Sequence, residues 1–320
     1  MFLVMTTKNV LRITISNTRL IWKIFLYTAI CLLALTGIAV AAAWPLVSSL
    51  NADGFFTAIW NYLNTNASNA NIGDVLANTG GLMDSLMTIL SNHTADLLWL
   101  LGVVFFVYFI VGAIFLGQQG LAAGQCIYGY MASNSKLSFV GSLLANIGKS
   151  MKLRLVKFIT LLPLDILIGA ALFFSLDLFS LGGIWPHIAP SVIILGASML
   201  IAIRQALFCC WIPCMTVKNF GVFKALKEGV KSSCVKFGRV LLSSFVLVLI
   251  VFVLNYAFMF FTAGVALILT IPISLMMMHV FGFVVYFQNN GLKFYVDNGT
   301  IITPNKIESN DELSKIKNIV

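Results

Sequence analysis

Long runs of apolar residues alternate with shorter polar segments along the chain. They cover residues 20–43, 97–117, 158–176 and 188–217, and two more share the uncharged stretch 240–287. A helix needs about 20 apolar residues to cross roughly 30 Å of hydrocarbon. The last stretch has 48 residues, too many for one helix, so we expect Thr262, Ala263 and Gly264 to break it into a tight hairpin. The pattern predicts an all-α bundle of six membrane-spanning helices.

Composition narrows the class of protein in the same direction. Of the 320 residues, 60% are hydrophobic and only 10% are charged, and the mean hydropathy is +0.98. Soluble domains carry about 25% charged residues. These values exclude a cytosolic enzyme, a secreted disulfide scaffold and a disordered protein.

The basic residues predict the orientation of the spans. Arg204 apart, all of the twenty lie before or at the start of the first span, between the second and third, between the fourth and fifth, or after the sixth. Residues 44–96 and 177–187 contain none. The positive-inside rule then places both termini in the cytoplasm of a multi-pass plasma-membrane protein. The net charge of +9 faces anionic lipid headgroups, so lipid rather than nucleic acid is the expected partner.

The first span also has the outline of a signal sequence. Ala41, Ala42 and Ala43 resemble a cleavage site behind a basic segment. The apolar run is longer than the roughly 7–15 residues usual in a signal peptide. We therefore expect an uncleaved anchor, with cleavage as the alternative.

A shift of 82 residues aligns the two central basic segments. It places Lys136, Val140, Leu144, Lys149 and Ser150 on Lys218, Val222, Leu226, Lys231 and Ser232. Each segment has the pattern of an amphipathic helix, which we expect to lie in the cytoplasmic interface of the membrane. The sequence thus predicts a parallel internal repeat of span, interfacial helix and span.

The predicted organisation has six parts. They are residues 1–43 (basic N-terminus and first span), 44–96 (outer loop with two amphipathic helices), 97–182 and 183–263 (the two repeat units), 264–287 (sixth span) and 288–320 (cytoplasmic tail). In the tail, Asp297, Asn298 and Gly299 predict a β-hairpin turn. Ser309 and Glu312 have the capping-box spacing of a short final helix.

Two ionisable residues inside the spans are the candidate site. Asp165 and Arg204 lie at depths that differ by about 6 Å on neighbouring antiparallel helices, a difference that an arginine side chain can cover. We expect them to form a pair buried between the helices. The pair either stabilises the bundle or belongs to a polar binding site on a substrate path, lined also by Gln205 and Asn255.

Other chemistry has weaker support in the sequence. The six cysteines lie outside the predicted outer loops, and no metal-binding motif is present, so we expect no cofactor. Ser198, after Gly196 and Ala197, together with His279 resembles the Ser/His dyad of rhomboid intramembrane proteases. Met199 stands where that family has Gly, and the outer loop lacks Arg, so this remains a remote alternative.

The doubled unit of basic amphipathic helix and span, over roughly residues 95–290, resembles the membrane domain attached to some glycerophosphodiester phosphodiesterases. The ending 291–296 with 300–304 is similar to the tails of uncharacterised Firmicutes-type membrane proteins. These resemblances imply a bacterial plasma-membrane protein and carry no catalytic residues to this chain.

We therefore predict a non-enzymatic membrane protein that binds or moves a small amphiphilic or lipid-like molecule. The alternative is an accessory or scaffold subunit that docks a membrane protein partner or a second copy of the chain.

Overall fold

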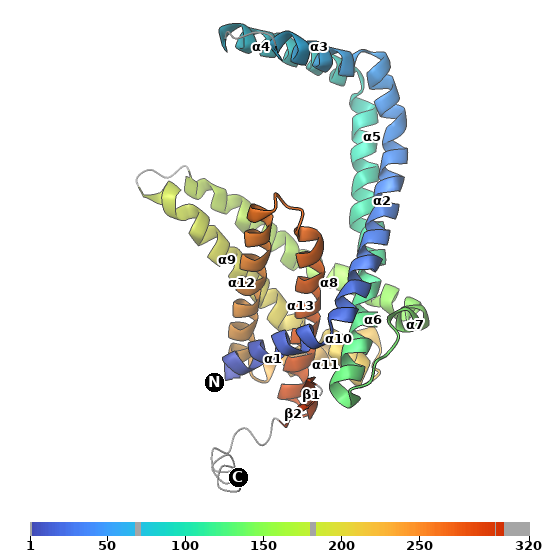
Figure 1. The fold of residues 1–320 in the computed structure, drawn as a ribbon, viewed down its shortest axis with the longest axis vertical. Helices are drawn as coiled ribbons and strands as arrows, with labels where there is room; N and C mark the ends of the chain where they lie inside the picture. The colour runs from blue at the N-terminus through green and yellow to red at the C-terminus, as the bar shows by residue number, and fades with distance from the viewer. Residues whose placement is uncertain (1, 68–71, 180–183, 298, 304–320) are drawn as a thin grey trace. The chain divides into compact units, whose positions relative to one another are not determined.

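The computed structural model describes residues 2–67, 72–179, 184–297 and 299–303 (Figure 1). The chain divides into two compact units, Ala29–Ala113 and the combination of Met1–Thr28 with Ile114–Val320. Nearly all of the described backbone is helical.

The membrane-spanning candidates can be counted within the described ranges. Five helices are long and apolar enough, namely Thr18–Ala52, Ile147–Leu178, His187–Val217, Phe237–Phe261 and Leu267–Asn289. Thr79–Asn92 and Thr94–Tyr108 form a sixth candidate if this pair, bent by 77°, is taken as one span. The predicted all-α architecture is confirmed, with five to six candidate spans. The predicted second span, 97–117, lies on α5 (Thr94–Phe105), the π-helical turn η1 (Phe106–Val111) and the start of α6 (Gly112–Ser133).

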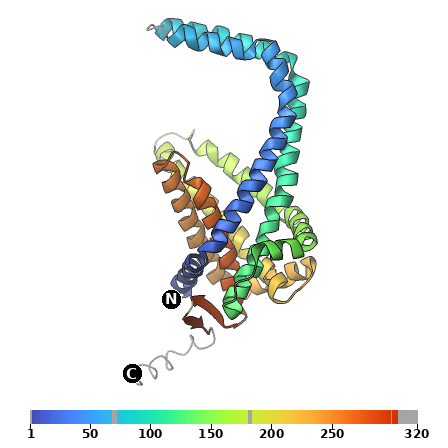
Figure 2. The same ribbon diagram turned by 45° about the vertical axis from the view of Figure 1, so that its right-hand side comes forward.

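In the unit formed by residues 29–113, α2 (Thr18–Ala52) and α5–η1 are antiparallel neighbours. The hydroxyl groups of Thr36 and Tyr108 lie 3.0 Å apart, and Asp53 contacts His93 at the other end. Helices α3 (Phe55–Ala67) and α4 (Ile72–Asn92) occupy the segment where two helices are expected, and they lie side by side in Figures 1 and 2.

Helix α2 is longer than the predicted first span, because it continues to Ala52 instead of ending at residue 43. Leu46 and Leu50, one turn apart, are both buried. They extend the packed face of the helix beyond Pro45, and Pro45 does not end it.

The other unit is a bundle that contains α8 (Ile147–Ser175), α9 (Trp185–Phe208), α12 (Phe237–Phe261) and α13 (Leu267–Asn289). Helices α12 and α13 run side by side in both views (Figure 2). The turn between them has positive φ at Ala263 and Gly264, +48° and +87°, as expected where a helix ends in the left-handed region. The predicted break at these residues is confirmed.

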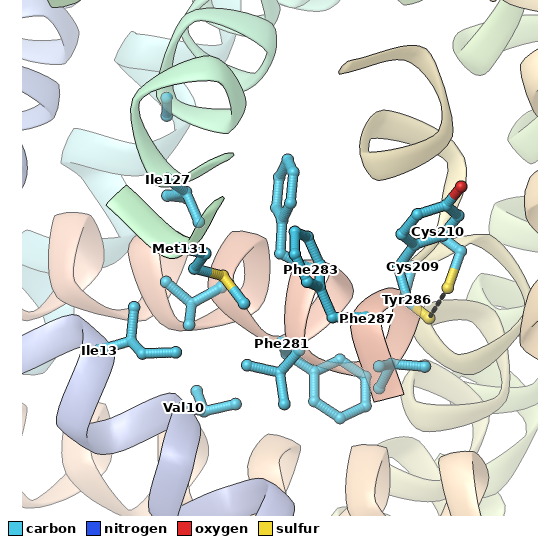
Figure 3. Packing of buried hydrophobic residues seen from close by; sticks show 14 of the residues in the cluster. Val10, Ile13, Ile127, Met131, Cys209, Cys210, Phe281, Phe283, Tyr286 and Phe287 are labelled. Carbon is cyan, nitrogen blue, oxygen red and sulfur yellow. Dashed lines mark hydrogen bonds between the residues drawn. The ribbon is translucent and has the colours of Figure 1, made fainter. Parts of the chain in front are cut away.

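The core of this unit surrounds the C-terminal half of α13. Phe281, Phe283 and Phe287 are almost fully buried and pack with residues of α6 and α1, as Figure 3 shows. Buried residues occur on every side of this part of α13, because other elements surround it.

Helix α1 (Phe2–Ser16) belongs to the core, although the sequence had predicted only a basic segment there. Val10 and Ile13 have no exposed surface.

Strands β1 (Phe294–Asp297) and β2 (Thr300–Ile302) pair antiparallel, so the predicted hairpin is confirmed. Arg12 of α1 forms an ion pair with Asp297 of β1, which ties the two ends of the described chain together. The predicted helix at Ser309 lies outside the described residues.

The two aligned basic segments fold differently in detail. The first is divided at Asn146 between α7 (Phe139–Ala145) and α8, whereas the second is one helix, α11 (Val222–Cys234). Val222, Ala225 and Gly229 form the buried face of α11, while Lys224 and Lys227 are exposed. The internal repeat and the position of these helices in a membrane interface stay predictions.

Candidate functional site

The candidate site is a cavity of about 260 Å³ between α8, α9, α10 (Trp211–Val217) and α13. Its lining is formed by Lys157, Leu161, Ile201, Arg204, Gln205, Phe208, Cys209, Ile212, Pro213, Leu275, Met278 and His279. Most of these side chains are apolar, and the polar ones are few. An apolar pocket with a small number of converging polar groups is typical of a small-molecule site.

An interruption between α9 and α10 shapes one wall of the cavity. Helix α9 ends at Phe208, and α10 begins at Trp211. Pro213 has no N–H to donate to the carbonyl of Cys209 four residues earlier, so the α-helical ladder cannot continue through this point. Gly282 of α13 packs against that carbonyl, and a Cβ at Gly282 would lie 2.3 Å from the Cys209 oxygen. The break and the close approach hold α10 and α13 together beside the cavity.

Asp165 and Arg204 form the predicted pair, and Arg204 also lines the cavity. Nε of Arg204 lies 2.6 Å from Oδ1 of Asp165, and Nη2 donates a hydrogen bond to Oδ2 at 3.1 Å. The predicted burial is wrong, since 47% of the Asp165 side chain and 33% of the Arg204 side chain are exposed. Among the residues that the structure describes, this face of α8 is largely open, and Ile166 and Leu167 on it are also exposed.

Two further bases lie near this pair. Lys157 lines the cavity, and the charges of Arg154, Arg204 and Asp165 all act on it. Arg154 packs against α6, where its side chain fills the space that a Cβ at Gly117 would occupy. The lining of the cavity therefore contains two basic side chains, and the acidic side chain of Asp165 is paired with one of them, Arg204.

The other predicted binding residues separate into two places. Gln205 lines the cavity, and its Nε2 lies 3.4 Å from the carbonyl oxygen of Met278. Asn255 is not among the lining residues. Its Nδ2 donates to Ser274 at 2.8 Å and its Oδ1 accepts from Thr270 at 2.7 Å, which makes it a polar link between α12 and α13.

The structure does not join the residues of the remote protease alternative. His279 lines the cavity, whereas Ser198 is buried in α9 and is not part of the lining. Within the described ranges no hydrogen bond links the two side chains. Catalysis by this pair stays an untested prediction.

The cysteines of the α9–α10 junction are packed inside the protein. Cys209 and Cys210 are buried with their sulfur atoms 3.7 Å apart, as the dashed line in Figure 3 marks. Among the residues that the structure describes, no group of three His, Cys, Asp or Glu side chains is placed to hold a metal ion.

Lys157 is the functional candidate that the sequence pattern did not single out. The distribution of charge had assigned it to the inner edge of the third span, like the other bases of its segment. Its distinguishing signal is its position two helical turns before Asp165, which places both on one side of α8.

Comparisons with known proteins found no relative of the chain. No protein-family model, curated protein or solved structure matches the chain.

Proposed function

We propose that this protein is a multi-pass membrane protein that binds a small amphiphilic molecule in the cavity between α8, α9, α10 and α13, and holds it or moves it across the bilayer. The cavity volume, about 260 Å³, is near the lower limit of small-molecule sites. It suits a polar head and the first part of an apolar chain, with the rest of the chain in the surrounding lipid.

The partly exposed pair of Asp165 and Arg204 carries this proposal. Asp165 lies two turns beyond Lys157, or about 12 Å along the helix. A charged side chain at the centre of a span costs about 2.5–3.5 kcal/mol on insertion scales, and such residues normally face a hydrated cavity or a ligand. Protein covers this pair only in part, and Arg204 lines the cavity, where a ligand could complete the coverage.

The charge distribution supports the proposed orientation. Exposed lysines on α11, such as Lys224 and Lys227, suit a membrane surface with anionic headgroups. We place this helix and both termini on the cytoplasmic side of a bacterial plasma membrane.

Native mass spectrometry of the gently solubilised protein tests the proposal. We expect a discrete small-molecule adduct on the wild type and its loss in Ile201→Trp, which fills the cavity. Ile166→Trp is the matched control, since Ile166 is exposed on α8 and does not line the cavity. Retention of the adduct in Ile201→Trp, or a wild-type mass without any small-molecule adduct, would contradict the proposal. A wild-type mass that carries only a second polypeptide would favour the accessory-subunit alternative.

A further inference from the structure

We infer that the molecule bound in this cavity has an anionic head, a phosphate or a carboxylate, held by Lys157 and Arg204. The inference rests on the proposed function and adds the chemical class of the ligand. It follows from the charges at the cavity, from the unused donors of two side chains and from the arrangement of the apolar lining.

The first step is the balance of charge. Two basic side chains, Lys157 and Arg204, line the cavity, and the one carboxylate beside them, that of Asp165, is paired with Arg204. Unpaired charge in an apolar environment is costly, and an opposite charge is the usual compensation. The cavity is therefore complementary to an anion and repels a cation.

The second step concerns the donors that remain. Lys157 makes no hydrogen bond or ion pair with any residue of the described chain. Arg204 uses Nε and Nη2 for Asp165, which leaves Nη1 for another acceptor. An ammonium group and a guanidinium edge beside one another form a common binding arrangement for phosphate and carboxylate oxygens.

The third step is the direction of the ligand. Leu161, Phe208, Ile212 and Met278 supply apolar surface in the same cavity. The cavity is partly open, and Arg204 in its lining is itself only partly buried. A ligand with its head at the two bases therefore has apolar contacts along the cavity and a path for its chain into the bilayer.

The role of Asp165 gives the inference its sharpest test. Asp165 competes with an anionic ligand for Arg204, so removal of its charge should leave anion binding intact or strengthen it. For a cationic ligand, Asp165 would be the binding group, and the same change would weaken binding. Asp165→Asn keeps the size of the side chain and so separates these cases.

The experiment is a titration of delipidated full-length protein, followed by native mass spectrometry. The probes are dioleoyl phosphatidylglycerol, dioleoyl phosphatidylcholine and inorganic phosphate. We expect the anionic lipid to bind at least tenfold more tightly than the zwitterionic one. Lys157→Gln should weaken binding of the anionic lipid about tenfold, and Asp165→Asn should not weaken it. Lys152→Gln is the matched control, because Lys152 is an exposed lysine of the same helix outside the cavity.

The outcomes distinguish the inference from the proposed function. Equal binding of both lipids that is insensitive to Lys157→Gln, or weaker binding in Asp165→Asn, would overturn the anionic assignment and leave the amphiphile cavity in place. Failure of every probe to bind the wild type would overturn both. If inorganic phosphate competes with the anionic lipid and this competition is lost in Lys157→Gln, the site recognises the phosphate group itself. If the lipid binds and phosphate does not compete with it, the site recognises the intact headgroup. Circular dichroism of each variant confirms that it is folded.

Discussion

Substitution of Gly282 by Ala tests whether α13 packs on the α9–α10 junction as closely as the structure shows. The added Cβ would lie 2.3 Å from the backbone oxygen of Cys209 and 3.2 Å from its carbonyl carbon. Carbon and oxygen atoms in ordinary contact lie about 1 Å farther apart than the shorter of these distances. Both contacted atoms belong to the backbone, so a side-chain rotation cannot relieve the overlap.

The expected cost follows from this geometry. Insertion of one methyl group into a packed interior costs about 1–3 kcal/mol when the surroundings must shift. The value for Gly282→Ala should lie at the upper end, because α13 is surrounded by packed elements and has little freedom to move. At about 2–4 °C per kcal/mol, a cost near 3 kcal/mol should lower the midpoint of thermal unfolding by about 6–12 °C.

Thermal unfolding in a mild detergent, followed by circular dichroism, measures this effect. Gly229→Ala is a graded comparison, since its Cβ would lie 3.0 Å from Cα of Trp211, and we expect a smaller loss. Gly196→Ala is the matched control, because Gly196 has open space around it in α9. Ala is the better helix former, so this variant should be as stable as the wild type or more so.

The unfolding midpoints of the three variants are expected to rise in the order Gly282→Ala, Gly229→Ala, Gly196→Ala. A Gly282→Ala variant as stable as Gly196→Ala would refute the close approach of α13 to the Cys209 carbonyl. The wall of the cavity would then lose the contact that holds α10 and α13 together.

Three further predictions concern other parts of the chain. The carboxylates of Asp53 and Asp96 raise the pKa of His93, so their stabilising interaction is fully present below about pH 6.5 and is lost as the pH rises through the raised pKa. Amide hydrogen exchange in α5 near His93, corrected for intrinsic rates, should therefore be slower at about pH 5.5 than at about pH 8. His93→Gln should abolish this difference. Equal protection of the wild type at the two pH values would contradict the prediction. Ile13→Ala should destabilise the docking of α1 by about 2–5 kcal/mol and speed proteolysis of the tail, and an unchanged cleavage rate would show that α1 does not hold the hairpin. Asn255→Leu should cost about 0.6–1.7 kcal/mol in thermal unfolding, because it removes interhelical hydrogen bonds between α12 and α13, and an unchanged midpoint would refute this role.

Features that depend on local sequence were predictable. The apolar runs correspond to helices, because a segment in hydrocarbon must satisfy its backbone hydrogen bonds internally. The hairpin turn at Gly264 and the β-turn near Asp297 were predictable because few residues adopt the backbone conformations of such turns. Pairing of Asp165 with Arg204 followed from helix rise and chain direction alone.

Burial was harder to predict than pairing. The sequence indicated that Asp165 and Arg204 lie at similar depth, but their exposure depends on whether a third helix covers the pair. Helix α1 shows the converse case. Its bases suggested a polar flank, whereas Val10 and Ile13 are fully buried by contacts with elements near the other end of the chain.

The apolar pattern was thus sufficient for the all-α class and for five to six candidate spans, and the distribution of bases gave a predicted orientation. The cavity, the place of Lys157 in it and the contact of Gly282 with Cys209 depended on the tertiary structure. Hydropathy and turn preference act between residues near one another in the chain. A cavity is the space that helices leave when they pack, and residues far apart in sequence determine where that space lies.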